Sequence, residues 1–301
     1  MPSPVAVIIN ASAGSDDKQR LGEQFAETLR AAGLDARVTL ARGGDELMES
    51  ARRAAVDGCA RVVAGGGDGT ISTVAALLAG TDKALAVLPL GTFNHFAKDL
   101  GLPLELERAV SVAAAGRVVR VDVGEVNGRV FINNSSIGLY PRLVSRRQRQ
   151  QSRLGRGKWA AFLFAALAVL RRYPFLDVRL EADGRTLLRR TPFVFVVNNE
   201  YLMDGLQIGA RARLDAGRLS LYVTHRTGRW GLVVLALRAL AGRLREARDF
   251  DALSAREVTI ETRRRRQRLR VATDGEVTVM RTPLHYRVRP GALSVVVPEE
   301  P

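Results

Sequence analysis

Residues 61–80 read RVVAGGGDGTISTVAALLAG, and this stretch indicates how the chain folds. The apolar run 61–65 has the composition of a buried strand, and 70–79 has that of a helix. The glycines between them allow positive φ angles and a close approach of the backbone to a ligand. Such a turn can hold an anion on the free amides of the helix. It equally fits a plain strand-to-helix turn with Asp68 or Thr70 as the N-cap.

The alternation of strand and helix extends over the first third of the chain. We predict strands at 5–10, 36–41, 61–65 and 84–90, and helices at 18–32, 45–57 and 70–79. Strands separated by helices form a parallel sheet that is covered on both faces. Ligands of such sheets bind at the carboxyl ends of the strands. The sequence therefore predicts an α/β domain over 1–122 with its site at that edge.

Beyond about Val123 the pattern changes to short strands joined by tight turns. Asn127-Gly128 and Asp183-Gly184 are hairpin signals between alternating apolar residues. We predict a mostly antiparallel, β-sandwich-like C-terminal domain over 123–280, and leave open whether 281–301 completes the first domain. Its strands are expected within 118–138, 177–199, 218–225, 257–262, 268–278 and 293–297, with two inserted helices near 157–171 and 230–248.

The composition is that of an ordinary globular protein. The 301 residues are 47% hydrophobic and 26% charged, and a chain of this length suggests two domains. The single cysteine, Cys59, excludes an intrachain disulfide and favours a reducing compartment. The first residues lack the basic region of a signal peptide, and no apolar run reaches about 18 residues. We therefore expect a cytoplasmic protein without a membrane-spanning helix.

The net charge of +15 favours anionic partners. Residues 145–158 carry basic side chains and no acid, and the apolar run 159–170 follows; 263–270 is a second basic cluster. This arrangement suits peripheral binding to an anionic membrane surface. It also fits a solvated loop before a core helix. Aromatic residues do not interleave the arginines, which argues against nucleic acid.

Two further motifs lie where the predicted sheet would present a ligand. PLGTFNHFAKDLGLP (89–103) follows the fourth strand, with a turn at Gly91 and Thr92 and Asn94 as possible donors. Taken alone it also fits a Pro-Gly turn with an asparagine cap. ATDGEV (272–277) places Asp274 and Glu276 around a glycine. Taken alone it fits a solvated hairpin turn.

In this order GGDGT, PLGTxN and a late DGE resemble the diacylglycerol kinase catalytic family of soluble bacterial lipid kinases. Sphingosine and ceramide kinases are related to that family, and NAD kinases share GGDGT. The resemblance runs from about residue 5 to residue 297. It implies an α/β domain of the NAD-kinase and diacylglycerol-kinase type, a β-sandwich-like domain, and an ATP site in the cleft between them.

The resemblance also implies roles for individual residues. Glu276 and Asp274 match the segment that supplies the catalytic base, so Glu276, or alternatively Asp274, would orient or deprotonate the lipid hydroxyl. A Mg²⁺ site of the family uses an aspartate directly before glycine, where this chain has Ala216, with Asp215 one position earlier. Asp68 would face ATP-bound Mg²⁺ or hold the shape of its loop. The nucleotide-binding positions are Asn10, Gly14, Gly66, Gly67, Asp68, Gly69, Thr70, Ser72, Gly91, Thr92 and Asn94.

We therefore predict an ATP-dependent lipid kinase that phosphorylates a hydroxyl of a diacylglycerol-like lipid, with ATP and Mg²⁺ as cofactors. Its lipid would lie in an anionic membrane surface, with the protein peripheral to the inner face; a homodimer is left open. The alternatives are an NAD kinase, which GGGDGT and the NNE at 198–200 favour, and a nucleotide-binding, membrane-associated protein that has lost catalysis. The second alternative rests on Ala216 and on His95, which stands where the family has aspartate.

Overall fold

The computed structural model describes residues 4–11, 26–31, 33–138, 175–201, 211, 213–224, 250–262 and 268–299. The chain divides into two compact units. Unit 1 comprises Met1–Val123, Arg213–Ala216 and Arg289–Pro301, and unit 2 comprises Gly124–Ala212 and Gly217–Val288. The boundaries at 123 and 288 fall inside strands β5 (Arg117–Val126) and β16 (Leu284–Val297).

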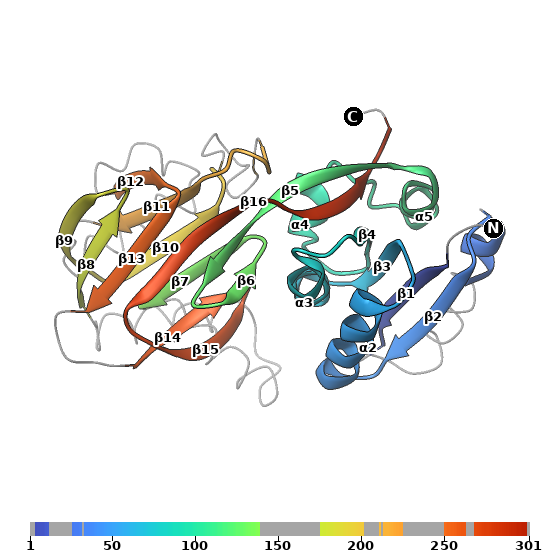
Figure 1. Ribbon diagram of the computed structural model, residues 1–301, viewed down its shortest axis with the longest axis horizontal. Helices are drawn as coiled ribbons and strands as arrows, with labels where there is room; N and C mark the ends of the chain where they lie inside the picture. The colour runs from blue at the N-terminus through green and yellow to red at the C-terminus, as the bar shows by residue number, and fades with distance from the viewer. Residues whose placement is uncertain are drawn as a thin grey trace, which may run out of the picture. The chain divides into compact units, whose positions relative to one another are not determined.

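Unit 1 contains the predicted parallel sheet. Its strands are β1 (Val5–Asn10), β2 (Ala36–Ala41), β3 (Arg61–Gly66) and β4 (Ala84–Pro89), in the order β2-β1-β3-β4. Each pair is parallel, and Ser294–Val295 of β16 adds a further parallel strand beside β4. Figure 1 shows these strands in blue to cyan with the end of β16 in red. The carboxyl ends of β1, β3 and β4 therefore share one edge.

Helices cover the sheet of unit 1. They are α2 (Gly44–Val56), α3 (Asp68–Leu78), α4 (His95–Asp99) and α5 (Leu106–Ala115), and residues 26–31 are also helical. The consecutive residues Val62, Val63 and Ala64 of β3 are all buried, so both faces of the sheet are covered. Helices α4 and α5 were not predicted. Helix α4 has only five residues, whereas α5 buries Ala109, Val110 and Ala113 at helical spacing.

Unit 2 contains two antiparallel sheets. One has the order β12-β11-β10-β7-β14-β15, and the other contains β16-β13-β8-β9, with β5 beside β16 and β6. The strands are β6 (Arg129–Phe131), β7 (Asn134–Gly138), β8 (Leu176–Ala182), β9 (Arg185–Thr191), β10 (Phe193–Asn198), β11 (Leu219–Thr224), β12 (Phe250–Ala255), β13 (Glu257–Thr262), β14 (Arg268–Thr273) and β15 (Glu276–Arg281).

A shared core joins these two sheets into a sandwich. Buried side chains such as Leu180 and Ile260 come from one sheet, and Ile137, Val196 and Val271 come from the other. The hairpins at Asn127-Gly128 and Asp183-Gly184 have positive φ at both residues, as the sequence predicted. Strand β12 was not predicted, and β16 begins nine residues before the predicted strand 293–297.

Several predicted features lie outside the described residues. These are most of the helix 18–32, the helices near 157–171 and 230–248, the basic stretch 145–158, part of the cluster 263–270, and Gly14. Among the helices that are described, none has the length and apolar character needed to cross a bilayer.

Candidate active site

The predicted nucleotide loops of unit 1 meet at the carboxyl edge of the parallel sheet. Strand β1 ends at Asn10, β3 at Gly66 and β4 at Pro89, and Gly66 pairs with Pro89 in the ladder. The Asn10 Nδ2 atom donates a hydrogen bond of 2.8 Å to Thr70 Oγ1. Three segments that are distant in sequence therefore meet at this edge of the sheet.

Two glycines of this edge, Gly66 and Gly91, are required for close packing. A Cβ atom on Gly91 would lie 2.5 Å from the Gly67 Cα atom and 2.8 Å from Asn94 Oδ1. A Cβ atom on Gly66 would lie 2.5 Å from the Thr70 side chain, whereas one on Gly69 would meet open space. None of these four glycines has a positive φ, so of the two properties that glycine allows here, close approach of the backbone is the one used. Contact between the two loops is the reason for glycine here.

Asp68 connects the two glycine loops. It is the first residue of α3, whose N-cap is Gly67, so neither Asp68 nor Thr70 is the cap. The Asp68 Oδ1 atom accepts a hydrogen bond of 2.7 Å from the amide of His95, the first residue of α4. A carboxylate is favourable at a helix N-terminus, which has free amides and a positive dipole. Because the donor is backbone, histidine at position 95 preserves this link.

Asn94 shapes the second loop through its side chain. Its φ of 50° is left-handed, and its Oδ1 atom accepts a hydrogen bond of 2.9 Å from the Gly91 amide. Its Nδ2 atom donates to the carbonyls of Gly91 and Pro89, at 2.9 and 3.2 Å. Its amide group therefore holds the loop closed. Thr92 beside it is exposed.

The start of α3 is suited to an anion. The amides of Thr70 and Ile71 bond to the carbonyl of Gly67. Within the described part of the chain, no acceptor is found for the amides of Asp68 and Gly69. Free amides at the positive end of a helix dipole favour phosphate groups. Ser72 is buried and bonds to the Gly69 carbonyl at 3.2 Å, so it stabilises this first turn.

In unit 2, Asp274 lies in the turn between β14 and β15. The turn has positive φ at Asp274 and Gly275, as in a tight hairpin. The Asp274 carboxylate accepts three backbone amides, from Ile132 at 2.8 Å and from Asn133 and Asn134 at 2.9 and 3.0 Å. Burial of the carboxylate raises its pKa, against the opposing effects of these hydrogen bonds and of the positive charge of Arg211. The turn therefore does more than reverse the chain, because it holds the Asp274 carboxylate in one position.

Glu276 has a different environment from Asp274. It is the first residue of β15, and its carboxylate pairs with the guanidinium of Arg129 on β6. The Glu276 side chain is 56% exposed. An ion pair of this exposure contributes about 0–1 kcal/mol, so it fixes the Glu276 side chain only weakly. Asp274 is therefore the more rigidly positioned of the two carboxylates.

Arg211 lies beside the backbone segment that holds Asp274, and the sequence did not predict it. It is 5% exposed and donates to the carbonyl of Ile132 and to Asn133 Oδ1, at 2.6 and 2.8 Å. The Asn198 Nδ2 atom also donates to Ile132, at 3.1 Å. In a chain with 46 lysines and arginines, nothing in the sequence distinguishes this arginine from those at the surface.

At the predicted metal position in unit 1, the described residues do not provide a ligand set for a resident Mg²⁺ ion. Asp215 pairs with Arg213, with 3.0 Å between Oδ1 and Nε, and this hydrogen bond lowers the pKa of Asp215. Ala216 offers no side-chain oxygen. Among the described residues, no three acidic, histidine or cysteine side chains gather as a ligand set. The residues present do not fit the implied ion, because Mg²⁺ needs several oxygen ligands.

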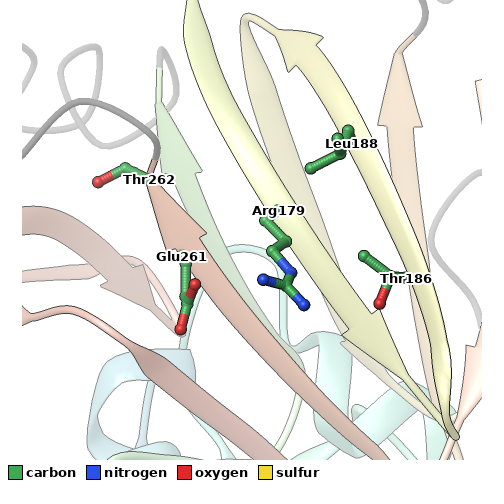
Figure 2. Close-up of a pocket in the computed structure, with 5 residues that line it drawn as sticks. All are labelled: Arg179, Thr186, Leu188, Glu261 and Thr262. Atoms are coloured by element: carbon green, nitrogen blue, oxygen red, sulfur yellow. The ribbon is translucent and has the colours of Figure 1, made fainter.

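A pocket of about 370 Å³ lies on the outer side of β8, β9 and β13 in unit 2. Figure 2 shows Arg179 on β8 between Glu261 on β13 and Thr186 on β9, with Leu188 and Thr262 at the sides. It contains none of the predicted site residues. Its charged and polar side chains are typical of a solvated sheet face.

The structure thus groups the predicted residues by unit. Unit 1 brings together Asn10, the segment 66–72 and the segment 91–94, and unit 2 brings Asp274 and Glu276 together at one turn. Asp215 belongs to unit 1. Gly14 lies in a part of the chain that is not described.

Comparison with known proteins connects both units to one group of enzymes. Residues 4–126 match the diacylglycerol kinase catalytic domain, and residues 141–297 match the YegS C-terminal NAD kinase beta sandwich-like domain. A probable lipid kinase YegS-like protein of Pseudomonas fluorescens is 30% identical, covering 94% of this chain and 93% of the relative. A diacylglycerol kinase of Staphylococcus carnosus is 28% identical, covering 73% and 72%.

Solved structures support the fold. A diacylglycerol kinase and a putative diacylglycerol kinase of Bacillus anthracis superpose with TM-scores of 0.70 and 0.75, at 22% and 24% identity. Each comparison covers 98% of this chain and 97% of the other. The predicted combination of an α/β domain and a β-sandwich domain is confirmed, and so is the resemblance to the diacylglycerol kinases. This chain belongs to the YegS-like lipid kinases, a family of enzymes that carry a diacylglycerol kinase catalytic domain.

Proposed function

We propose that this enzyme transfers the γ-phosphoryl group of ATP to a hydroxyl of a diacylglycerol-like lipid. The observation that carries this proposal is the contact between the two glycine loops of unit 1. There Gly91 leaves no room for a side chain against Gly67, and the first amides of α3 lie beside this contact. This arrangement suits a chain of phosphates bound by backbone groups.

Asp68 and Asn94 keep this phosphate site in shape. Asp68 fixes the start of α4 through the His95 amide, and Asn94 closes its own loop. Phosphoryl transfer depends mainly on positioning and on stabilising charge, so a rigid backbone site is what the reaction needs. ATP would arrive as its magnesium complex, in which the ion reduces the repulsion between the phosphates and Asp68.

Asp274 is proposed as the base that accepts the proton of the lipid hydroxyl. Its carboxylate offers about four lone-pair positions, and the three amides occupy three of them. Its raised pKa makes it a better proton acceptor than an ordinary aspartate near neutral pH. Glu276, which pairs with Arg129, is proposed to help orient the hydroxyl.

The proposal is tested by supplying labelled ATP with three acceptors in separate reactions. These are diacylglycerol in mixed micelles, NAD⁺, and micelles without an acceptor lipid. Label is expected in phosphatidic acid. Label in NADP⁺ alone would assign the chain to the NAD kinases, which share its GGDGT motif. ATP hydrolysis or binding without transfer to any acceptor would favour a nucleotide-binding protein that has lost catalysis.

A further inference from the structure

Arg211 is a buried cation that the proposed reaction does not use directly. It is 5% exposed and lies opposite Tyr201 in an isolated antiparallel bridge. Placing a guanidinium inside a protein costs several kcal/mol unless hydrogen bonds and opposite charge compensate. The contacts of Arg211 therefore indicate what the buried charge does.

Those contacts fix one short segment of backbone. The Arg211 Nη1 atom donates to the carbonyls of Ile132 and Asn198, at 2.6 and 3.3 Å. Its Nη2 atom donates to Asn133 Oδ1 at 2.8 Å. The Asn198 side chain bonds to the same Ile132 carbonyl, and the Asn198 amide bonds to the Asn133 carbonyl at 3.0 Å. The segment 132–133 is thus held from two directions.

The peptide group between Ile132 and Asn133 connects Arg211 to Asp274. Its carbonyl oxygen accepts from Arg211, and its amide donates to Asp274 Oδ1 at 2.9 Å. This group is planar and rigid, so fixing one end fixes the direction of the other. Hydrogen bonds in such a chain polarise one another, which strengthens both when a cation and an anion lie at the ends.

We propose that Arg211 is a positioning residue for Asp274, which fixes the Ile132–Asn133 peptide and supplies a countercharge to the carboxylate through it. The proposal deepens the proposed function, because it rests on Asp274 as the base. The charge of Arg211 opposes the rise in the Asp274 pKa that burial causes. The neighbouring titratable groups are Glu276, which pairs with Arg129, and Tyr201, whose hydroxyl bonds to the Asn134 side chain at 3.0 Å.

Arg211→Gln and Arg211→Lys separate charge from hydrogen bonding. Both retain a donor for Ile132, and only lysine retains the charge. In Arg211→Gln the acidic limb of the kcat profile should move to higher pH by about one pH unit, with the KM for ATP within about twofold of wild type. In Arg211→Lys the limb should stay near its wild-type position. The proposal would be overturned if the acidic limb lay at the same pH in both variants, or if it stayed at its wild-type pH in Arg211→Gln.

Arg61→Gln in unit 1 is the matched control. Arg61 also donates to two backbone carbonyls, those of Ala113 and Ala114, at 2.5 and 2.6 Å. Its loss should lower the thermal stability and leave the acidic limb unmoved. If Arg211→Gln does not fold, Asn133→Ala is used to test the proposal. This substitution removes one hydrogen-bond acceptor of the Arg211 guanidinium and keeps the charge of Arg211. A kcat lowered by about tenfold with an unchanged KM for ATP supports positioning, and an unchanged kcat refutes it.

A readout without turnover keeps this test independent of the proposed function. In protein labelled with ¹³C at the aspartate carboxyl carbon, the resonance that Asp274→Asn removes reports the titration of Asp274. Its midpoint should lie higher in Arg211→Gln than in wild type and in Arg211→Lys. If the protein phosphorylates no lipid and this order of midpoints holds, the proposed function fails and the link between Arg211 and Asp274 stands. Equal midpoints would refute the link itself.

Discussion

At the scale of single residues, two aspartates have contrasting roles. Asp68 caps a neighbouring helix with its carboxylate, and its charge lies beside the amides proposed to bind phosphate. Asp274 is enclosed by amides that hold it in one orientation. In both cases the surrounding backbone sets the role of the side chain. The sequence showed the aspartates and could not show these partners, which lie 27 and about 140 residues away in the chain.

Asp68→Ala should reduce activity to a few per cent of wild type or less, because it separates the two glycine loops. Loss of the cap should cost about 1 kcal/mol of unfolding free energy. Steady-state kinetics and denaturant unfolding measure the two effects. Asp57→Ala is the control, since Asp57 accepts the Cys59 amide at 3.0 Å in the same unit, away from the loops. Activity within about threefold of wild type in Asp68→Ala would contradict this account.

The raised pKa of Asp274 predicts how activity depends on pH. The carboxylate must be ionised to accept a proton, so kcat should fall as the pH drops through the raised pKa. The acidic limb should therefore lie above the ordinary aspartate value of about 3.9. A kcat profile, with a preincubation control for unfolding in acid, measures it. Activity that persists unchanged down to pH 4 would rule out Asp274 as the base.

At the scale of elements, the approach of β3 and β4 and the turns that follow them creates the candidate phosphate site. Gly66 and Pro89 are paired at the ends of these strands, and the next residues make the contact between Gly67 and Gly91. Glycine at position 91 reflects van der Waals contact between two loops. A single sequence cannot distinguish this cause from a need for left-handed backbone.

Gly91→Ala should therefore reduce activity by about 100-fold or more, because a misplacement of about 1 Å at such a site is costly. The new Cβ atom would overlap with the Gly67 Cα atom, and the loops must separate to accommodate it. Gly43→Ala is the control, since Gly43 is the N-cap of α2 and its Cβ would meet open space. Kinetics on both variants gives the comparison. Equal activities would show that the contact between the loops is not needed.

The sequence predicted the elements with strong apolar periodicity and the turns with characteristic turn residues. Strands β1 to β4 and the hairpin at Asn127-Gly128 are examples. It did not predict α4, which has five residues, or β12, which lacks a clear apolar alternation. At the site it predicted the loops and the DGE carboxylates. It could not predict Arg211, because only the fold brings this residue to the Ile132 carbonyl.

At the scale of the whole molecule, the net charge of +15 accompanies a family whose substrates are lipids. We propose that the basic residues help the enzyme reach an anionic bilayer. Binding to vesicles that contain phosphatidylglycerol should weaken as salt rises from about 0.05 to 0.5 M, because exposed charges are screened within about 8 Å at physiological salt. Sedimentation with anionic and neutral vesicles measures this.

A second test replaces the arginines of the basic stretch 145–158 with glutamine. This variant should bind anionic vesicles more weakly than wild type. The positions are Arg146, Arg147, Arg149, Arg153 and Arg156. Equal binding of the wild type to neutral and anionic vesicles would refute the proposal.

The most direct test of the whole account is the transfer of ³²P from γ-labelled ATP to diacylglycerol in mixed micelles, by wild type and by Asp274→Asn. Wild type should place the label in phosphatidic acid. Asp274→Asn should lower kcat by about 10²–10⁴-fold, the usual contribution of a positioned base, with the KM for ATP nearly unchanged. Absence of labelled lipid with wild type, or a kcat in Asp274→Asn close to that of wild type, would contradict the account.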